Sequence, residues 1–275
     1  MSVRADVIGR PARRRLRVGG PAIGGALATA YLSLVVLIPL AAVVAESTTG
    51  GASAFWEAVT SRQALAAMRF TVLASVVVVA VNIVTGTLIA WVLVRDEFRG
   101  KRFVNALIDL PFALPTIVAG LVLLSLYGPR SPLGINVANT RMAVFLALAF
   151  VTLPFVVRTV QPVLEELEAD VEEASASLGA NRLTTFRRII LPSLVPSIAA
   201  GAALSFARGI SEYGSLVLLS GNLPNRTEVA SVRVLTYIEN GDPGSAAAVA
   251  TLLLLVALAV IVALDVLQRR VARRG

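Results

Sequence analysis

The sequence contains no cysteine and no histidine. Their absence excludes disulfide bonds, thiol catalysis, Cys/His metal sites and proton relays through imidazole, so we expect no metal site. The only lysine is Lys101, and an arginine follows it, so the phosphate-binding motif Gly-x4-Gly-Lys-Ser/Thr cannot be formed. We therefore expect the chain to bind no cofactor and to be no enzyme.

The chain is also poor in charge. Charged residues make up 15% of its 275 residues and hydrophobic residues 56%, whereas soluble domains carry about 25% charged residues. Apolar runs of about 18 residues or more indicate transmembrane helices. The runs lie near residues 22–45, 70–94, 106–127, 142–160, 194–220 and 246–267. This pattern predicts an all-α polytopic membrane protein with six transmembrane helices, forming one membrane domain over residues 21–275.

Basic residues are distributed unevenly along the chain. An arm over residues 1–20 carries six arginines. They fit either a nucleic-acid contact or an anchor beside the first span, and the anchor is favoured because positive charge there fixes orientation. With the N-terminus inside, 18 of the 25 Lys and Arg residues fall in inner segments and six in outer segments, with Arg208 inside a span. This bias predicts that both termini and the loop over residues 164–192 are cytoplasmic, and we expect no nucleic-acid partner.

The segments predicted to lie outside the membrane are short. None reaches the roughly 50 residues that an independently folding domain needs. If the chain moves a solute selectively, recognition of that solute outside is expected to belong to another polypeptide.

One polar segment, residues 164–192, interrupts the apolar runs. Apolar residues recur in it at spacings of three and four, which predicts one stripe on a helix. These residues are Leu164, Leu167, Val171, Ala174 and Leu178. The opposite face carries Glu165, Glu166, Glu168, Asp170, Glu172 and Glu173, and Gly179 ends the helix as a residue free to adopt positive φ. An anionic leaflet would repel these carboxylates, so docking into a cytoplasmic protein is favoured over lying on lipid.

The same segment resembles the EAA loop of ABC-importer permeases, whose pattern is EAA, three residues, Gly, nine residues and I-x-L-P. The matching residues are Glu173, Ala174, Ser175, Gly179, Ile189, Leu191 and Pro192, with Ser175 in place of the second alanine. The resemblance implies a type I ABC-importer permease fold in which this loop couples to a cytoplasmic ATPase. It implies that Glu173 helps to orient the loop, Ala174 packs closely and Gly179 makes the turn. ATP and Mg²⁺ would then be bound by the partner ATPase.

A second candidate site lies in the fifth predicted span. At about 1.5 Å per residue, Arg208 lies roughly 20 Å along that span, beyond the middle of a hydrocarbon core about 30 Å thick. A charge at this depth costs about 2.5–3.5 kcal/mol, so we expect Arg208 to face the bundle interior or a water path. Arg208 and Glu212 form either a structural i,i+4 ion pair or the lining of an anion's path, in which Glu212 holds the arginine in place. The sequence leaves both interpretations open.

The fifth span is also rich in small residues, which let helices approach closely in lipid. They are Ala199, Ala200, Gly201, Ala202, Ala203, Ala207 and Gly209. Packing within this chain and packing against a second permease subunit are equally compatible with them. Asp109 and Asp265 lie near cytoplasmic ends of spans, where snorkelling lowers the cost of a charge, and no role is predicted for them.

Three further segments, residues 91–96, 108–134 and 150–162, resemble the T-subunit family of sulfate/thiosulfate permeases. Residues 208–214 resemble a run shared by sulfate and molybdate permeases, from which Ser211 and Tyr213 depart. The resemblance implies a multi-pass permease of the bacterial inner membrane. Its implied partners are membrane lipid, a homologous second permease subunit, two copies of the ATPase and an extracytoplasmic sulfate-binding protein. A molybdate/tungstate permease and a proton-coupled anion carrier remain alternatives.

Overall fold

The computed structural model describes residues 20–167 and 169–272. The arginines of the predicted basic arm and Glu168 of the acidic face lie outside the described residues, and the side chains of Asp170, Val171 and Glu172 are not described either. The chain divides into two compact units, Met1–Val43 and Val44–Gly275. Each unit is described by itself below, and the boundary expected at residue 20 stays a prediction.

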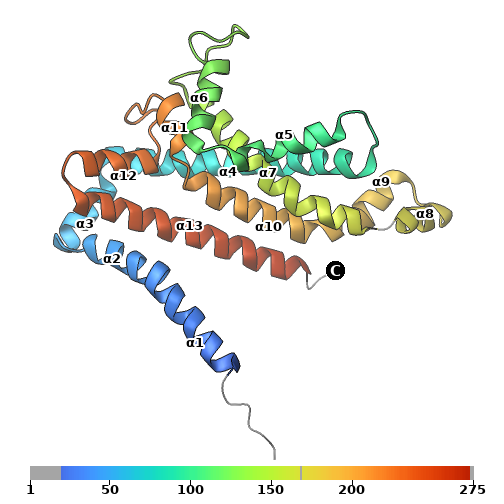
Figure 1. Ribbon diagram of the computed structural model, residues 1–275, viewed down its shortest axis with the longest axis horizontal. Helices are drawn as coiled ribbons and strands as arrows, with labels where there is room; N and C mark the ends of the chain where they lie inside the picture. The colour runs from blue at the N-terminus through green and yellow to red at the C-terminus, as the bar shows by residue number, and fades with distance from the viewer. Residues whose placement is uncertain (1–19, 168, 273–275) are drawn as a thin grey trace, which may run out of the picture. The chain divides into compact units, whose positions relative to one another are not determined.

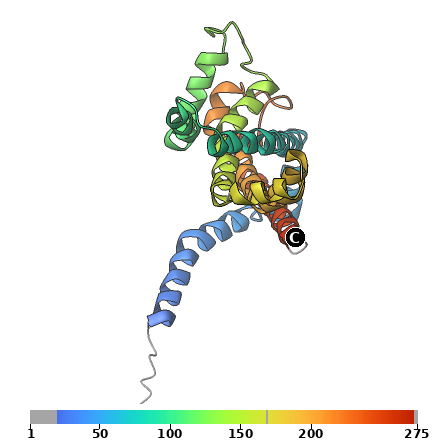
Figure 2. The same ribbon diagram turned by 90° about the vertical axis from the view of Figure 1, so that its right-hand side faces the viewer.

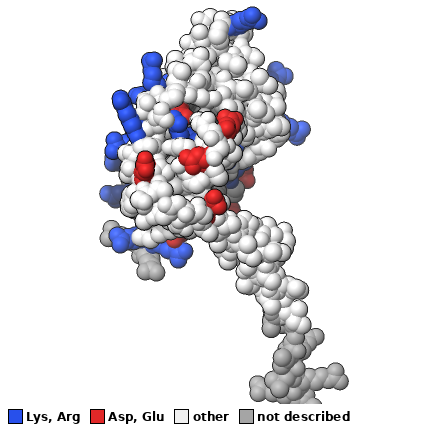
Figure 3. All heavy atoms as spheres, turned by 90° about the vertical axis from the view of Figure 1, so that its left-hand side faces the viewer, with Lys and Arg blue, Asp and Glu red and all other residues white. Residues whose placement is uncertain are grey.

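The first unit consists of apolar helix. Its elements are α1 (Gly20–Leu32), a π-helical turn η1 (Ser33–Leu37) and α2 (Ile38–Glu46), whose last residues belong to the second unit. No charged residue occurs between positions 20 and 45, and this helix is white in Figure 3. The wide π turn comes just before Pro39, whose ring in a regular α-helix would collide with the carbonyl four residues earlier.

In the described residues of the second unit, all regular secondary structure is helical, as Figure 1 shows. Its helices are α3 (Gly51–Thr60), α4 (Arg62–Arg95), α5 (Lys101–Ala113), α6 (Thr116–Tyr127), α7 (Arg141–Glu166), α8 (Ala169–Ser177), α9 (Arg182–Thr185), the π turn η2 (Phe186–Ile190), α10 (Leu191–Ile210), α11 (Gly214–Leu219), α12 (Ala230–Glu239) and α13 (Pro243–Ala272).

Among the described residues, five helical segments are long and apolar enough to cross a membrane. They are Ile23–Glu46, Arg62–Arg95, Arg141–Glu166, Arg182–Ile210 and Pro243–Val266. A sixth span is obtained if α5 and α6, which are bent by 120° relative to each other, count as one broken span. The all-helical, polytopic fold predicted from the sequence is confirmed. The orientation of the termini stays a prediction.

Two of the predicted spans are broken rather than continuous. In the third, Leu114 is extended (φ −86°, ψ 133°), because the ring of Pro115 disfavours helical geometry in the residue before it. In the fifth, α10 ends at Ile210 and α11 starts at Gly214. One helix over residues 194–220 is therefore a wrong prediction, because apolar length alone does not reveal where the backbone turns.

Helices α4 and α10 both pack closely on α7. A Cβ at Gly86 of α4 would lie 2.9 Å from Val156 Cβ, and a Cβ at Gly201 of α10 would lie 2.3 Å from Thr159 Oγ1. Glycine at these two positions therefore sets how near the helices come to α7. Helices α4, α7, α10 and α13 lie side by side in Figure 1, with α6 beside α11, and Figure 2 shows the same bundle turned by 90°.

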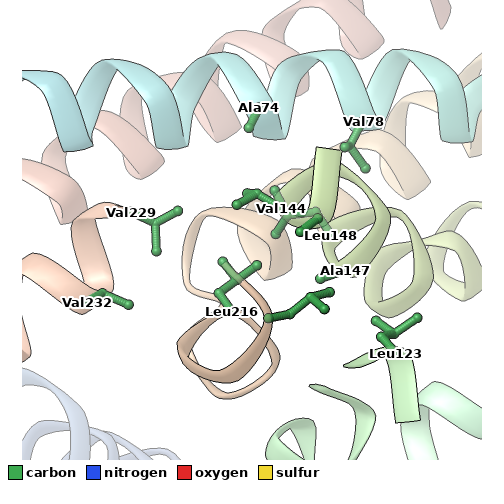
Figure 4. Close-up of a cluster of buried hydrophobic side chains, with 11 residues drawn as sticks. Ala74, Val78, Leu123, Val144, Ala147, Leu148, Leu216, Val229 and Val232 are labelled. Carbon is green, nitrogen blue, oxygen red and sulfur yellow. The ribbon is translucent and has the colours of Figure 1, made fainter. Parts of the chain in front are cut away.

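The largest buried apolar cluster joins the helices of the second unit. Figure 4 shows how its side chains point toward one another, from Ala74 and Val78 on α4, Leu123 on α6, Val144, Ala147 and Leu148 on α7, Leu216 on α11, and Val229 and Val232 at α12. Of the small residues in the fifth predicted span, Gly201, Ala202 and Gly209 are buried inside this chain. Packing within the chain accounts for these three.

Candidate functional site

The polar loop over residues 164–192 folds as two arms that meet at a glycine turn. The first arm is not the single amphipathic helix expected from Leu164 onward, because α7 ends at Glu166 and α8 begins at Ala169. Leu164 is fully buried in one cluster with Ile190 and Leu194, whereas Leu178 is 89% exposed. One continuous apolar stripe is therefore a wrong prediction. The end of α7 is buried in the bundle before the chain turns.

Gly179 makes the turn, as its position in the sequence predicts. Its φ is +83°, a left-handed conformation that costs other residues strain. The Gly179 amide donates to the Ala176 carbonyl at 2.9 Å, and the Ala180 amide donates to the Ser175 carbonyl at 3.0 Å. These two bonds form the Schellman motif, which satisfies the free carbonyls at the end of α8.

A hydrogen bond closes the loop between its two arms. The hydroxyls of Ser175 on α8 and Thr185 on α9 lie 2.7 Å apart, and both side chains are buried. Asn181 caps the second arm, since its Oδ1 accepts from the Thr184 amide at 2.8 Å. The position at which this chain departs from the EAA pattern, Ser175, thus holds a buried polar contact that alanine cannot make.

The second arm runs without interruption into α10. The π turn η2 directly precedes Pro192, as η1 precedes Pro39, and the wider turn relieves the same clash of the proline ring. Ile189 and Leu191 are half-buried, Pro192 is exposed, and Ile190 between them is buried. The second arm and α10 thus form one continuous helical segment, Arg182–Ile210.

The outer surface of the loop is polar, and its inner surface covers a cavity. Glu173 and Ala174 are exposed, as are Glu165 and Glu166 at the end of α7. Behind the loop lies a cavity of about 590 Å³ lined by residues that include Trp91, Arg95, Glu173, Arg182, Phe186 and Ile190. Two contacts join the elements of its wall: Trp91 packs edge-to-face on Phe186 at 5.8 Å, and Arg95 donates to the Leu167 carbonyl at 3.2 Å.

Arg208 and Glu212 form the ion pair that the sequence suggested. Arg208 Nη2 lies 2.6 Å from Glu212 Oε2, with side chains 29% and 1% exposed. The pair is not contained in one helix, because Glu212 lies beyond the end of α10. Its other oxygen accepts from the Ser215 amide and hydroxyl, both at 2.8 Å, and its carbonyl accepts from the Ser231 hydroxyl at 2.7 Å. Glu212 thus ties α10, α11 and α12 together, while part of the Arg208 guanidinium stays accessible.

An ion pair that sequence reasoning missed links the broken third span to α7. Arg158 donates to both carboxylate oxygens of Asp109, at 2.7 and 2.6 Å. It also donates to Asn105 on α5 at 3.0 Å and to Gln161 on α7 at 2.7 Å. Asp109, to which the sequence gave no role, is therefore half of a bidentate pair. The sequence offered one signal for this pair: Arg158 and Asp109 both lie near the predicted cytoplasmic ends of consecutive spans.

A second missed pair lies near the other end of the bundle. Glu228 and Arg233 form an ion pair in which both side chains are buried, and the Arg233 guanidinium carbon lies 5.6 Å from the centre of the Tyr237 ring. Burial raises the pKa of the Glu228 carboxyl above its usual range, and the charge of Arg233 offsets part of that effect. The charge of Glu228 is therefore balanced inside the protein by its ion pair with Arg233.

The chain is similar to known transport proteins over most of its length. The sequence profile described as "Binding-protein-dependent transport system inner membrane component" matches residues 82–274. The chain belongs to this family. A "Sulfate transport system permease protein CysT" from Synechocystis sp. (strain ATCC 27184 / PCC 6803 / Kazusa) is 44% identical over 246 residues, which cover 87% of this chain and 86% of that protein. The protein of the same name from Escherichia coli (strain K12) is 40% identical over 251 residues, which cover 89% and 91%.

Solved structures show the same fold at low sequence identity. A chain of a bacterial alginate ABC transporter, in complex with its alginate pentasaccharide-bound periplasmic protein, superposes with a TM-score of 0.75 at 17% identity. The match covers 91% of this chain and 94% of that one. The likeness extends over nearly the whole chain and shows the fold of an ABC transporter permease.

Proposed function

We propose that the chain is the transmembrane permease subunit of an ABC importer for sulfate or thiosulfate. The observation that carries the proposal is the extensive similarity to sulfate permeases, and the buried hydrogen bond that joins the two arms of the loop supports a docking role for it. In this proposal both termini and the loop face the cytoplasm. The loop docks into an ATPase, present in two copies, which binds ATP and Mg²⁺. A homologous second permease completes the path, and an extracytoplasmic binding protein delivers the anion.

The loop is suited to carry a displacement between two proteins. Gly179 fixes the turn, and the Ser175–Thr185 hydrogen bond holds the two arms together. The second arm continues as α10, which carries Arg208. ATP-driven movement of the docked loop would thus act on the helix that bears the charged pair.

Arg208 would line the path of the anion. Its side chain is 29% exposed although it lies in a helix that qualifies as a membrane span. A guanidinium facing lipid there would cost about 2.5–3.5 kcal/mol, so the exposed part must face a partner or water. Glu212, anchored by Ser215 and Ser231, would hold its position.

The experiment that tests the function is reconstitution. The chain is placed in vesicles with its second permease, ATPase and binding protein, and uptake of labelled sulfate is measured with and without ATP. We expect uptake that requires ATP, the ATPase and the binding protein, and that thiosulfate inhibits. Uptake that persists without the ATPase would refute the importer in favour of a carrier. Uptake of molybdate or tungstate that added sulfate does not inhibit would refute sulfate as the substrate.

The docking role of the loop is tested with a pair of matched glycine variants. Gly179→Val places a β-branched residue at φ +83°, which strains the backbone by about 1–2 kcal/mol. We expect it to release the ATPase from the purified complex. Gly134→Val introduces the same strain at φ +69° in the connection between α6 and α7, and it should leave the ATPase bound. Equal retention of the ATPase in both variants would contradict docking through this loop.

A further inference from the structure

A pocket rich in arginine lies at the end of α7 opposite the polar loop. Arg141 is the first residue of α7, and the 26 residues of this helix separate its ends by about 39 Å. The pocket has a volume of about 240 Å³ and is lined by residues that include Arg69, Phe70, Arg141, Asn225, Arg226 and Glu228. A second hollow of about 490 Å³ shares Arg141 and Arg226 with it. An oxyanion the size of sulfate fits into either volume.

The charge of this pocket is strongly positive. Its one carboxylate, Glu228, points away from solvent and is paired with Arg233 inside the protein. The three arginines on the rim are therefore not neutralised by the pocket's own acid.

The guanidinium donors of these arginines are open. Arg141 is held in place by its Nε, which donates to the Arg226 carbonyl at 3.0 Å, and by the Phe70 ring 5.6 Å from its guanidinium carbon. Its two terminal nitrogens have no acceptor within the described part of the chain, and the same holds for the guanidinium groups of Arg69 and Arg226. Because a guanidinium presents its donors in a planar fork, it suits the oxygens of a sulfate-like anion.

The location of the pocket makes its charge unusual. In the proposed orientation, only six of the 25 Lys and Arg residues lie in outer segments, where positive charge is disfavoured. Three of these six, Arg69, Arg141 and Arg226, line this one pocket. Figure 3 faces the end of the second unit at which α4 starts, and its blue and red side chains are scattered over a largely white surface.

We propose that this pocket is an outer binding site for a tetrahedral oxyanion, occupied by the anion between its release from the binding protein and its entry into the path. The identity of the physiological ligand, sulfate or thiosulfate, rests on the proposed function. It deepens that function by giving the permease its own anion site, separate from Arg208. Binding is expected to be weak, on the order of millimolar, because exposed charge contacts in water each contribute little, and to weaken as salt is added.

The first test is chemical protection on the purified permease–ATPase complex without binding protein. Phenylglyoxal modifies accessible arginines, and peptide mass spectrometry gives the rate at each position with sulfate or with chloride of equal ionic strength. We expect sulfate to slow modification of Arg69, Arg141 and Arg226 at least threefold. Arg62, exposed two turns earlier on α4 and absent from the pocket, is the control and should react equally in both salts. Equal rates at all four arginines would overturn the proposal.

The second test separates an anion site from a docking surface for the binding protein. Sulfate uptake by reconstituted complexes is measured against binding-protein concentration for R69Q/R226Q and for the control R62Q. An anion site predicts that R69Q/R226Q lowers the maximal rate about three- to tenfold at an unchanged half-saturating concentration of binding protein. A raised half-saturating concentration with an unchanged maximal rate would overturn it in favour of docking. If the wild-type complex takes up no sulfate, the proposed function fails, whereas the protection result still reports on the site.

Discussion

Replacing Gly201 with alanine should force α10 away from α7. The added Cβ would lie 2.3 Å from Thr159 Oγ1 and 2.9 Å from Val156 Cα. The second contact is with backbone, which cannot rotate away. The first is with a hydroxyl that already donates to the Phe155 and Val156 carbonyls at 3.0 Å, so moving it costs those bonds. Overpacking of this kind costs about 1–3 kcal/mol.

The intrinsic preference of a helix for alanine works in the opposite direction. Alanine is favoured over glycine in a helix by about 0.5–1 kcal/mol, so the expected net loss for Gly201→Ala is about 1–2 kcal/mol. Gly209 on the same helix is the matched control, because it is also buried but its nearest neighbour would be Ser75 Oγ at 3.5 Å, an ordinary contact distance. Gly209→Ala should therefore be neutral or more stable by up to about 1 kcal/mol.

The assay is reversible unfolding of the purified chain in mild detergent by added dodecyl sulfate, followed by far-ultraviolet circular dichroism. The reasoning is refuted if Gly201→Ala is as stable as the wild type, or if both alanine variants shift stability alike. A Gly201→Ala chain that is stable but fails to assemble with the second permease would instead place Gly201 at the interface between subunits.

Three further predictions follow from side-chain contacts. Arg158→Gln and Asp109→Asn should each destabilise the chain by about 0.5–1.5 kcal/mol, because the ion pair is only partly exposed. A double-mutant cycle should show that the two losses are coupled, and additive losses would contradict a stabilising interaction between the two side chains. Ser175→Ala and Thr185→Val should each cost about 1 kcal/mol and should lower transport per ATP hydrolysed, with no further loss in the double variant. Hydrogen bonds from the side chain and amide of a serine in α13 lower the pKa of Asp242 below its unfolded value of 3.8. The charged carboxylate therefore stabilises the fold at pH values above 3.8, and this contribution is lost as the pH falls through the lower pKa of the folded state. Asp242→Asn should flatten the acid limb of a plot of the unfolding midpoint against pH.

The features predicted well from the sequence are those encoded locally. Long apolar runs identify the spans because lipid imposes a minimum length on any helix that crosses it. The turn at Gly179 was predictable because glycine after a helical stretch is a common signal for a left-handed residue. The ion pair of Arg208 with Glu212 was predictable from their spacing of four residues, although the structure places Glu212 just beyond the end of α10.

The features that were missed depend on contacts between distant segments or on single backbone turns. The partner of Asp109 lies 49 residues away on another helix, so its role cannot be read from its own surroundings in the sequence. The hydroxyls of Ser175 and Thr185 meet only because the turn brings the two arms together. The break after Ile210 falls among the polar residues between Arg208 and Ser215, and the sequence alone does not distinguish a charged pair within a helix from the end of that helix.

Three of the helix breaks in the described part of the chain are each held by a polar contact. Where a helix ends inside a membrane protein, the freed backbone groups and any charge must be satisfied by the protein itself. Glu212 does this at the break between α10 and α11, and Ser175 holds the turn after α8 to α9. Asp109, close before the break between α5 and α6, is held to α7 by Arg158. Each break is thus tied to a neighbouring helix by a polar contact, so the helices between the breaks are expected to move as rigid bodies when the loop is displaced.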